Sequence, residues 1–164
     1  MTLQEKPPFR IAFIHAPDPV YSDTQNYGAK FMPVWAYTLA AHIPDDGRFT
    51  TTLYDCRFEP EENITEHDIF LFSGMNQDNG NMEAVRARLQ AHYPASKSMI
   101  GGPIAWSFDQ AGSLDMLDGY DHVFIGDGEA EITPLLEAFR MKKTVERVNR
   151  AKERFSIGNA KPFF

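Results

Sequence analysis

The sequence predicts an α/β domain with a doubly wound, five-stranded parallel sheet. Two observations support this prediction: five short apolar or β-branched runs are spaced along the chain, and stretches with helical spacing of apolar residues lie between most of them. Strands that alternate with helices pair in parallel through right-handed crossovers, and the helices then cover both faces of the sheet. The 164 residues, 43% of them hydrophobic, are enough to build the core of one such domain.

The five predicted strands differ in how strongly the sequence indicates them. The run at 68–73 (DIFLFS) is almost continuously apolar, which is typical of a central parallel strand buried on both faces. The run at 50–55 (TTTLYD) is rich in β-branched residues and therefore also suits a strand. The other three are 10–15 (RIAFIH), 97–101 (KSMIG) and 121–126 (DHVFIG). We expect the flavodoxin-like strand order 2-1-3-4-5, although the sequence alone does not exclude another order.

Helical patterns separate these strands. Residues 32–43 (MPVWAYTLAAHI) are apolar on most faces and end before a Pro-Asp-Asp-Gly turn, and residues 82–93 repeat apolar positions at helical spacing. Leu114 and Leu117 indicate a short helix, and residues 129–140 a longer one with one apolar face.

These elements define the predicted domain boundaries. The α/β domain is expected at residues 10–141, after an N-terminal extension at residues 1–9. The composition then becomes basic, and we interpret residues 142–164 as a linker towards a missing downstream domain.

Composition limits the partners of the domain. Its net charge of -7 argues against a nucleic-acid partner, because such binders cluster Lys and Arg against phosphates. Cys56 is the only cysteine, so the chain can form no internal disulfide and cannot hold zinc or an iron–sulfur cluster on several thiolates. The sequence shows no signal peptide and no apolar run long enough to span a membrane. We therefore expect a cytoplasmic protein with a small-molecule or protein partner and no membrane partner.

The candidate site lies where the strands end. In open α/β sheets, ligands bind beyond the carboxyl ends of the strands, and three of the five loops there are rich in glycine, which admits close approach to the backbone. Ser73 would direct a hydroxyl into this crevice. Gly128 and Glu129 would open a helix whose first amides can bind an anion, although Glu129 is equally an ordinary first-turn acid.

Four segments carry a resemblance to a known family. Residues 33–41 (PVWAYTLAA), 73–75 (SGM), 100–103 (IGGP) and 124–129 (FIGDGE) resemble, in this order, the cobalamin-binding domain that precedes the core of many radical S-adenosylmethionine enzymes. The resemblance implies a corrin on the carboxyl edge, with its nucleotide tail passing the serine turn and the double glycine. We expect a bulky residue at Gly102 to block that tail and leave the fold intact. The implied cofactor-binding residues are Pro17, Asp55, Arg57, Ser73, Gly74, Met75, Gly101, Gly102, Pro103, Gly126, Gly128 and Glu129.

One segment departs from the wider cobalamin-binding fold. A D-x-H-x-x-G motif there supplies a histidine to cobalt, whereas residues 55–60 read DCRFEP, with Arg57 in place of histidine. Arginine has no lone pair to offer a metal, so the expected cobalamin is bound with its lower base detached and without a protein histidine on cobalt. The five scattered histidines are interpreted as surface or core residues, and no catalytic or metal-ligating residue is predicted.

The main hypothesis is thus a cobalamin-binding module of a radical S-adenosylmethionine enzyme that transfers methyl groups or rearranges a carbon skeleton. The iron–sulfur cluster and S-adenosylmethionine would bind only in the downstream domain of the same polypeptide, so this chain alone is expected to be inactive. One alternative is a cobalamin-free scaffold or substrate-contacting domain of such a protein. Another is a flavin-binding or signalling module of flavodoxin-like shape, ranked last because the first loop has neither a phosphate-binding Ser/Thr run nor paired acids.

Overall fold

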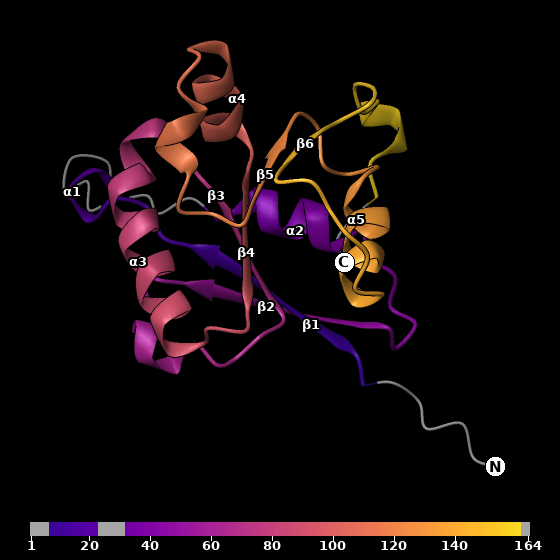
Figure 1. Ribbon diagram of the computed structural model, residues 1–164, viewed down its shortest axis with the longest axis horizontal. Coiled ribbons are helices and arrows are strands. Elements are labelled where there is room, and N and C mark those ends of the chain that lie inside the picture. Colours follow the sequence, from indigo (N-terminus) through magenta and orange to yellow (C-terminus); the bar gives the residue numbers. More distant parts are fainter. Residues whose placement is uncertain (1–6, 23–31, 162–164) are drawn as a thin grey trace.

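A parallel sheet of six strands, in the order β2-β1-β3-β4-β5-β6, forms the centre of the computed structural model (Figure 1). The structure describes residues 7–22 and 32–161. Every strand pair is parallel, so the carboxyl ends of the strands meet at one edge of the sheet. The strands are β1 (Phe9–His15), β2 (Phe49–Asp55), β3 (Ile69–Ser73), β4 (Lys97–Gly101), β5 (His122–Ile125) and β6 (Val148–Arg150).

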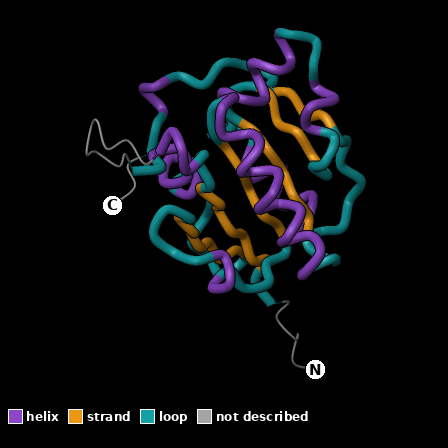
Figure 2. The backbone as a smooth tube through the Cα atoms, turned by 90° about the vertical axis from the view of Figure 1, so that its left-hand side faces the viewer, coloured by secondary structure: helices purple, strands orange, loops and turns teal. Residues whose placement is uncertain are grey.

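Helices cover both faces of this sheet. Residues of α3 (Asn79–His92) and α4 (Pro103–Gln110) pack on one face, and residues of α2 (Val34–Ala40) and α5 (Ile132–Arg140) pack on the other. Figure 2 shows a helix crossing the strands on the side that faces the viewer. Shorter helical segments are α1 (Pro19–Ser22), η1 (Glu61–Asn63), η2 (Asn76–Asp78), η3 (Leu114–Leu117) and η4 (Ile157–Asn159).

Alternation along the strands builds the two cores. In β3, Phe70 and Phe72 contribute to the core under α3 and α4, whereas Ile69 and Leu71 contribute to the core under α2 and α5. Successive side chains of a strand point to opposite faces, so a strand covered on both sides is apolar throughout. The predicted doubly wound α/β fold and the order of the first five strands are confirmed.

The predicted strand count is wrong, because the sheet has a sixth strand. β6 lies at Val148–Arg150, inside the segment expected to be a linker, and pairs with β5 through Val123, Phe124 and Ile125. It has three residues and none of them is fully buried. An edge strand this short, next to a run of charged residues, gives no alternating apolar pattern, which explains why the sequence did not predict it.

Three helical predictions also need correction. α4 was missed, although Pro103 occupies its first turn, where proline is favoured. The short helix expected at Leu114 and Leu117 is the 3-10 segment η3. α5 begins at Ile132, after a turn at residues 129–131, so the expectation that Gly128 and Glu129 open this helix is wrong. Within the described residues, no helix is both long enough and apolar enough to cross a membrane.

Candidate functional site

A mostly apolar cavity of about 290 Å³ lies at the carboxyl edge of the sheet. We call it the inner cavity. One side of α2, the first turn of α5 and the ends of β3, β4 and β5 form its wall. The apolar side chains of its wall include Leu39, Met99, Phe124 and Ile132, and Thr38 and Ser73 carry hydroxyl groups there. Ligands of open α/β sheets bind at this edge, so the cavity occupies the expected position.

The structure brings seven of the predicted site residues to the inner cavity and leaves five outside it. Those at the cavity come from the ends of three neighbouring strands, β3, β4 and β5, and from the loops that follow them. They are Ser73, Gly101, Gly102, Pro103, Gly126, Gly128 and Glu129; those outside it are Pro17, Asp55, Arg57, Gly74 and Met75.

The glycine at 102 is required by the backbone. Its φ angle is +76°, and a Cβ atom there would lie 2.2 Å from Ser73 Oγ. Residues other than glycine rarely adopt this conformation. A bulky residue at 102 would therefore collide with β3 and strain the chain, so the expectation that it would leave the fold intact is wrong.

The glycine at 126 is explained by the chain itself. Its φ angle is +107°, and a Cβ atom there would lie 2.8 Å from Ala151 Cβ. This glycine therefore lets the segment after β6 pass over the end of β5. The open space for a ligand lies beside these two glycines, within the inner cavity, and not at the positions of their missing side chains.

Asp55 and Arg57 pair with each other, away from the inner cavity. Arg57 donates to Asp55 through Nε at 2.9 Å and through Nη2 at 2.6 Å. Burial alone would raise the pKa of Asp55, but the hydrogen bonds and the charge of Arg57 outweigh it and lower the pKa. The side chains are only 10% and 16% exposed, so this ion pair occupies the polar groups of the loop after β2.

Two residues that the sequence analysis did not single out join the loops after β1 and β3. The carboxylate of Asp78 accepts hydrogen bonds from the backbone N–H of Asp18 at 3.0 Å and of Met75 at 2.8 Å. The amide of Asn81 donates to the carbonyl oxygen of Pro17 at 3.0 Å. Both side chains lie near the start of α3, a position from which Asp and Asn commonly bond to backbone groups.

His15 ends β1 beside Asp55, its partner in the register of β1 and β2. Its Nδ1 atom is buried and has no hydrogen-bond partner among the described residues, and burial lowers its pKa. The neutral ring is therefore favoured. No group of three His, Cys, Asp or Glu side chains that could hold a metal ion occurs in residues 7–22 and 32–161.

The residues of α2 and α5 that line the inner cavity were missed, because their apolar spacing indicates a buried helix face without showing a gap beneath it. Val34, Thr38 and Leu39 of α2 and Ile132 and Leu135 of α5 belong to this group. Trp35 of α2 has two neighbours. It packs edge-on against Phe13 at 5.7 Å and also lines the cavity.

Comparisons with known proteins support the fold and leave the ligand undefined. No family model and no curated protein matches the chain. Among solved structures, RcsB, a response regulator of Salmonella typhimurium, is similar with a TM-score of 0.55 and 7% identity. The alignment covers 86% of this chain and 64% of the RcsB chain, so this chain matches less than two thirds of that protein. The comparison supports the flavodoxin-like fold of the chain and carries no statement about its ligand or role.

Proposed function

We propose that this domain is a small-molecule-binding module whose inner cavity takes the flat heterocyclic end of a cofactor, and that this cofactor is cobalamin with its lower base detached. The observation that carries the proposal is the apolar cavity at the carboxyl edge, bordered by Ser73 and by the double glycine Gly101 and Gly102. The resemblance of the sequence to cobalamin-binding domains supplies the identity of the ligand.

The size and chemistry of the inner cavity fit the nucleotide tail of cobalamin. Its volume of about 290 Å³ is near the lower end of ligand pockets, which run from about 300 to 1,000 Å³. It is thus suited to a fused aromatic ring, while the corrin would remain outside, on the edge of the sheet. Thr38 and Ser73 offer hydroxyl groups to the polar atoms of the tail.

The chemistry of the whole protein is part of the same proposal. Bound cobalamin would supply methyl transfer or radical rearrangement, together with an iron–sulfur cluster and S-adenosylmethionine held in a downstream radical domain. The residues described above would bind and orient the cofactor. They would not react themselves.

Titration with hydroxocobalamin tests this proposal. Visible absorbance reports both binding and detachment of the lower base, and cobinamide, a corrin without the nucleotide tail, should bind at least about tenfold more weakly, which is about 1.4 kcal/mol. The variant Thr38→Phe fills the inner cavity and should weaken cobalamin binding. Ala41→Phe, on the same side of the sheet but outside the cavity wall, is the control and should bind like the wild type.

Three results would contradict the proposal. If no binding is detected at about 50 µM hydroxocobalamin, the free energy of binding is weaker than about 6 kcal/mol, which is too weak for a cofactor that stays bound to the protein. Equal affinity for cobalamin and cobinamide would show that the tail does not use the cavity. Tight binding of flavin mononucleotide, detected by quenching of flavin fluorescence, would instead favour the flavin alternative.

A second candidate function is a signalling module, which the fold similarity to a response regulator favours. A phosphoryl acceptor needs a reachable carboxylate at the carboxyl edge. Asp78, the acid nearest the end of β3 along the chain, is 7% exposed and both of its oxygens accept backbone hydrogen bonds. Incubation with acetyl phosphate should therefore leave Asp78 unmodified, and the carboxylate that stays reachable at this edge is that of the exposed Asp127. An acid-labile phosphoryl group detected by mass spectrometry would establish the signalling candidate.

A further inference from the structure

One edge of β6 has no strand partner among the described residues, because β6 is the last strand of the sheet and pairs only with β5 (Figure 1). The carbonyl oxygen of Arg147 accepts a hydrogen bond from β5 at 2.7 Å, and the N–H of Ala151 donates one to β5 at 2.9 Å. Backbone groups of successive residues in a strand point to opposite edges. Val148 and Arg150 therefore direct their N–H and C=O groups away from β5, where a further strand could bond to them.

A depression of about 830 Å³, which we call the edge groove, lies against all three residues of β6. On one face of the sheet, α5 lines it with Pro134, Leu135 and Ala138. On the other face, η3 lines it with Leu114. A strand added to a sheet directs its side chains alternately to the two faces. A groove with apolar walls on both faces therefore suits an added strand.

A second copy of the chain can supply that strand. A two-fold axis between two identical edges makes the strands antiparallel, and symmetric dimers of this kind are the commonest oligomers. With the axis beside Asn149, Val148 lies opposite Arg150 of the second copy, and Arg150 lies opposite Val148 of the second copy. These are hydrogen-bonded pairs, so every outward N–H and C=O group of β6 in both copies has a partner.

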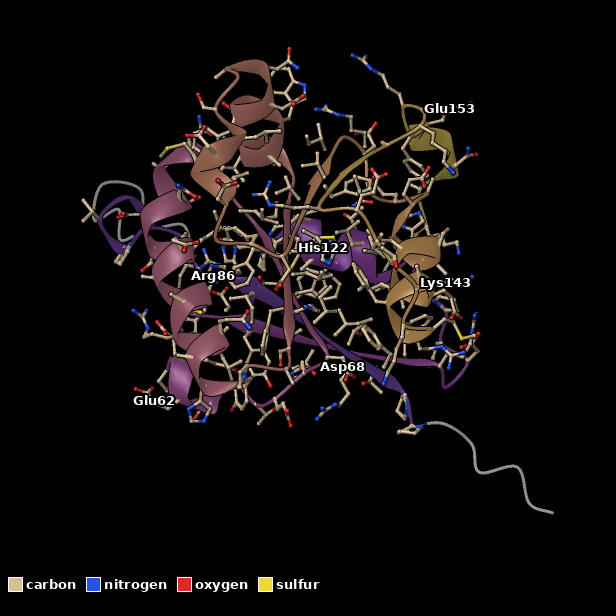
Figure 3. All side chains as sticks on the ribbon, viewed as in Figure 1. Glu62, Asp68, Arg86, His122, Lys143 and Glu153 are labelled. Carbon is tan, nitrogen blue, oxygen red and sulfur yellow. The ribbon has the colours of Figure 1, made fainter. Side chains whose placement is uncertain are left out.

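Two neighbouring positions of the axis fit the strand less well. An axis at Arg150 would place two arginines directly opposite each other, and like charges there are destabilising. An axis at Val148 would need the carbonyl oxygen of Glu146 for the ladder. That oxygen already accepts hydrogen bonds within the chain, from His122 Nδ1 at 2.9 Å and from Asn149 Nδ2 at 2.8 Å (Figure 3, where His122 is labelled). The axis beside Asn149 avoids both conflicts.

Charged side chains on the two sides of β6 are complementary about this axis. Glu146 precedes the strand by two residues and Lys152 follows it by two, so Glu146 of each copy lies across from Lys152 of the other. Both side chains are exposed, and in the described part of the chain neither has an ion-pair partner. Both arginines of the same segment, by contrast, pair with carboxylates of their own chain. Opposite charges across a strand pair stabilise it.

We propose that the chain forms a symmetric dimer in which β6 pairs with β6 of a second copy, so that the two sheets join into one. The two-fold axis passes beside Asn149, and an ion pair between Glu146 and Lys152 lies at each end of the ladder. A ladder this short gives a small interface, for which we expect a dissociation constant of about 10–100 µM. The inference is independent of the proposed function, because it concerns the edge of the sheet and needs no ligand.

Sedimentation equilibrium of the full chain measures the dissociation constant. Arg150→Pro removes an outward N–H that is not bonded to β5, and proline is tolerated at such positions of edge strands. It should weaken association at least about tenfold, which is about 1.4 kcal/mol. Arg150→Ala is the matched control, because it loses the same side chain and the same ion pair with Asp109 but keeps the N–H. It should associate within about threefold of the wild type, a difference of less than about 0.7 kcal/mol.

Charge reversal tests the two ion pairs. Glu146→Lys places two lysines across from each other at each end of the ladder, and Lys152→Glu places two glutamates there. Each variant should weaken association about tenfold or more, and the combination of both should restore it, because the charges are then opposite again. Urea unfolding of each variant checks that these surface changes leave the fold intact.

Cysteine cross-linking in a Cys56→Ala background tests the register. Asn149 faces its own copy in a non-hydrogen-bonded pair, where the Cα atoms are about 4.5 Å apart, a separation that a disulfide can span. Asn149→Cys should therefore form a cross-linked dimer on mild oxidation. Arg150→Cys should not, because residue 150 lies diagonally from its own copy, at about 7 Å or more.

Four results would overturn the proposal. The first is a chain that stays monomeric at about 500 µM, well above the expected dissociation constant. The second is a dimer that Arg150→Pro leaves at wild-type affinity, because such a dimer would use another surface. The third is a failure of the combined charge reversal to restore association. The fourth is a cross-link through Arg150→Cys without one through Asn149→Cys.

Discussion

Replacing Gly102 with alanine should destabilise the domain strongly, and replacing Ser73 with alanine in the same chain should recover part of the loss. A non-glycine residue at φ +76° costs about 1–3 kcal/mol in backbone strain. The new Cβ would also lie 2.2 Å from Ser73 Oγ, so that hydroxyl must leave its place, at about 0.5–1.5 kcal/mol for a side chain forced off its rotamer. The expected total is about 1.5–4.5 kcal/mol.

The Ser73→Ala background separates the two contributions. When residue 73 has no Oγ, its nearest atom to the new Cβ of residue 102 is the Cβ of residue 73, at 3.4 Å, which is an ordinary contact distance. The double variant should therefore be more stable than the sum of the single variants predicts, by about 0.5–1.5 kcal/mol, in a double-mutant cycle. Gly112→Ala is a control for the collision, because φ is also positive there, at +68°, and no atom lies within 4 Å of an added Cβ.

Urea unfolding followed by circular dichroism measures each free energy. Gly112→Ala should be destabilised without a collision, and the effects of Gly112→Ala and Ser73→Ala on the free energy of unfolding should be additive. The reasoning would be refuted if Gly102→Ala were as stable as the wild type, or if Ser73→Ala and Gly102→Ala were simply additive. Either result would mean that β3 and the β4–α4 turn are not as close as the structure places them.

Three further predictions follow from single groups. Burial raises the pKa of the Cys56 thiol to about 12, so a thiol reagent at pH 8 should react fully only after unfolding, and rapid modification of native protein would contradict the burial. Burial lowers the pKa of His15 and of His67 below 6.5, so the unfolded chain binds more protons than the folded chain just below pH 6.5. The free energy of unfolding should therefore fall as pH drops through 6.5. His15→Asn should reduce the slope of the free energy of unfolding against pH. An unchanged slope would exclude a buried neutral His15. The amide of Ala151, bonded to Ile125 O, should exchange its hydrogen more slowly than that of Arg154, and equal rates would show that β6 does not hold the segment after it.

The parts of the fold that the sequence predicted are those where the core determines the residue pattern. β3 is buried at all five positions and its sequence is apolar at four of them, so its place at the centre of the sheet could be inferred. β6 and α4 could not be, for different reasons. β6 is held by backbone pairing with β5, which leaves no mark on side-chain types. The Gly-Gly-Pro sequence at the start of α4 indicates a turn as strongly as a helix start.

The candidate site was predictable only in part. The glycine-rich ends of β4 and β5 indicated where the crevice lies, since the carboxyl edge of a parallel sheet follows from the strand order. The inner cavity also depends on how far α2 and α5 stand from the sheet, and side chains such as Thr38 and Leu135 carry no sequence signal for that distance. Arg57 was placed at the ligand from its position after β2, yet its ion pair with Asp55 holds it in its own loop.

The central claim is that the inner cavity holds the heterocyclic end of the cofactor, and intermolecular nuclear Overhauser effects test it most directly. With methyl-labelled protein saturated with hydroxocobalamin, the protons of the dimethylbenzimidazole ring should show effects to the methyl groups of Val34, Leu39 and Ile132, which line the cavity. Effects to Val145 and Leu114, which line a separate depression beside β6, would place the ligand elsewhere. Saturated protein without any effect to the three cavity residues would contradict the claim.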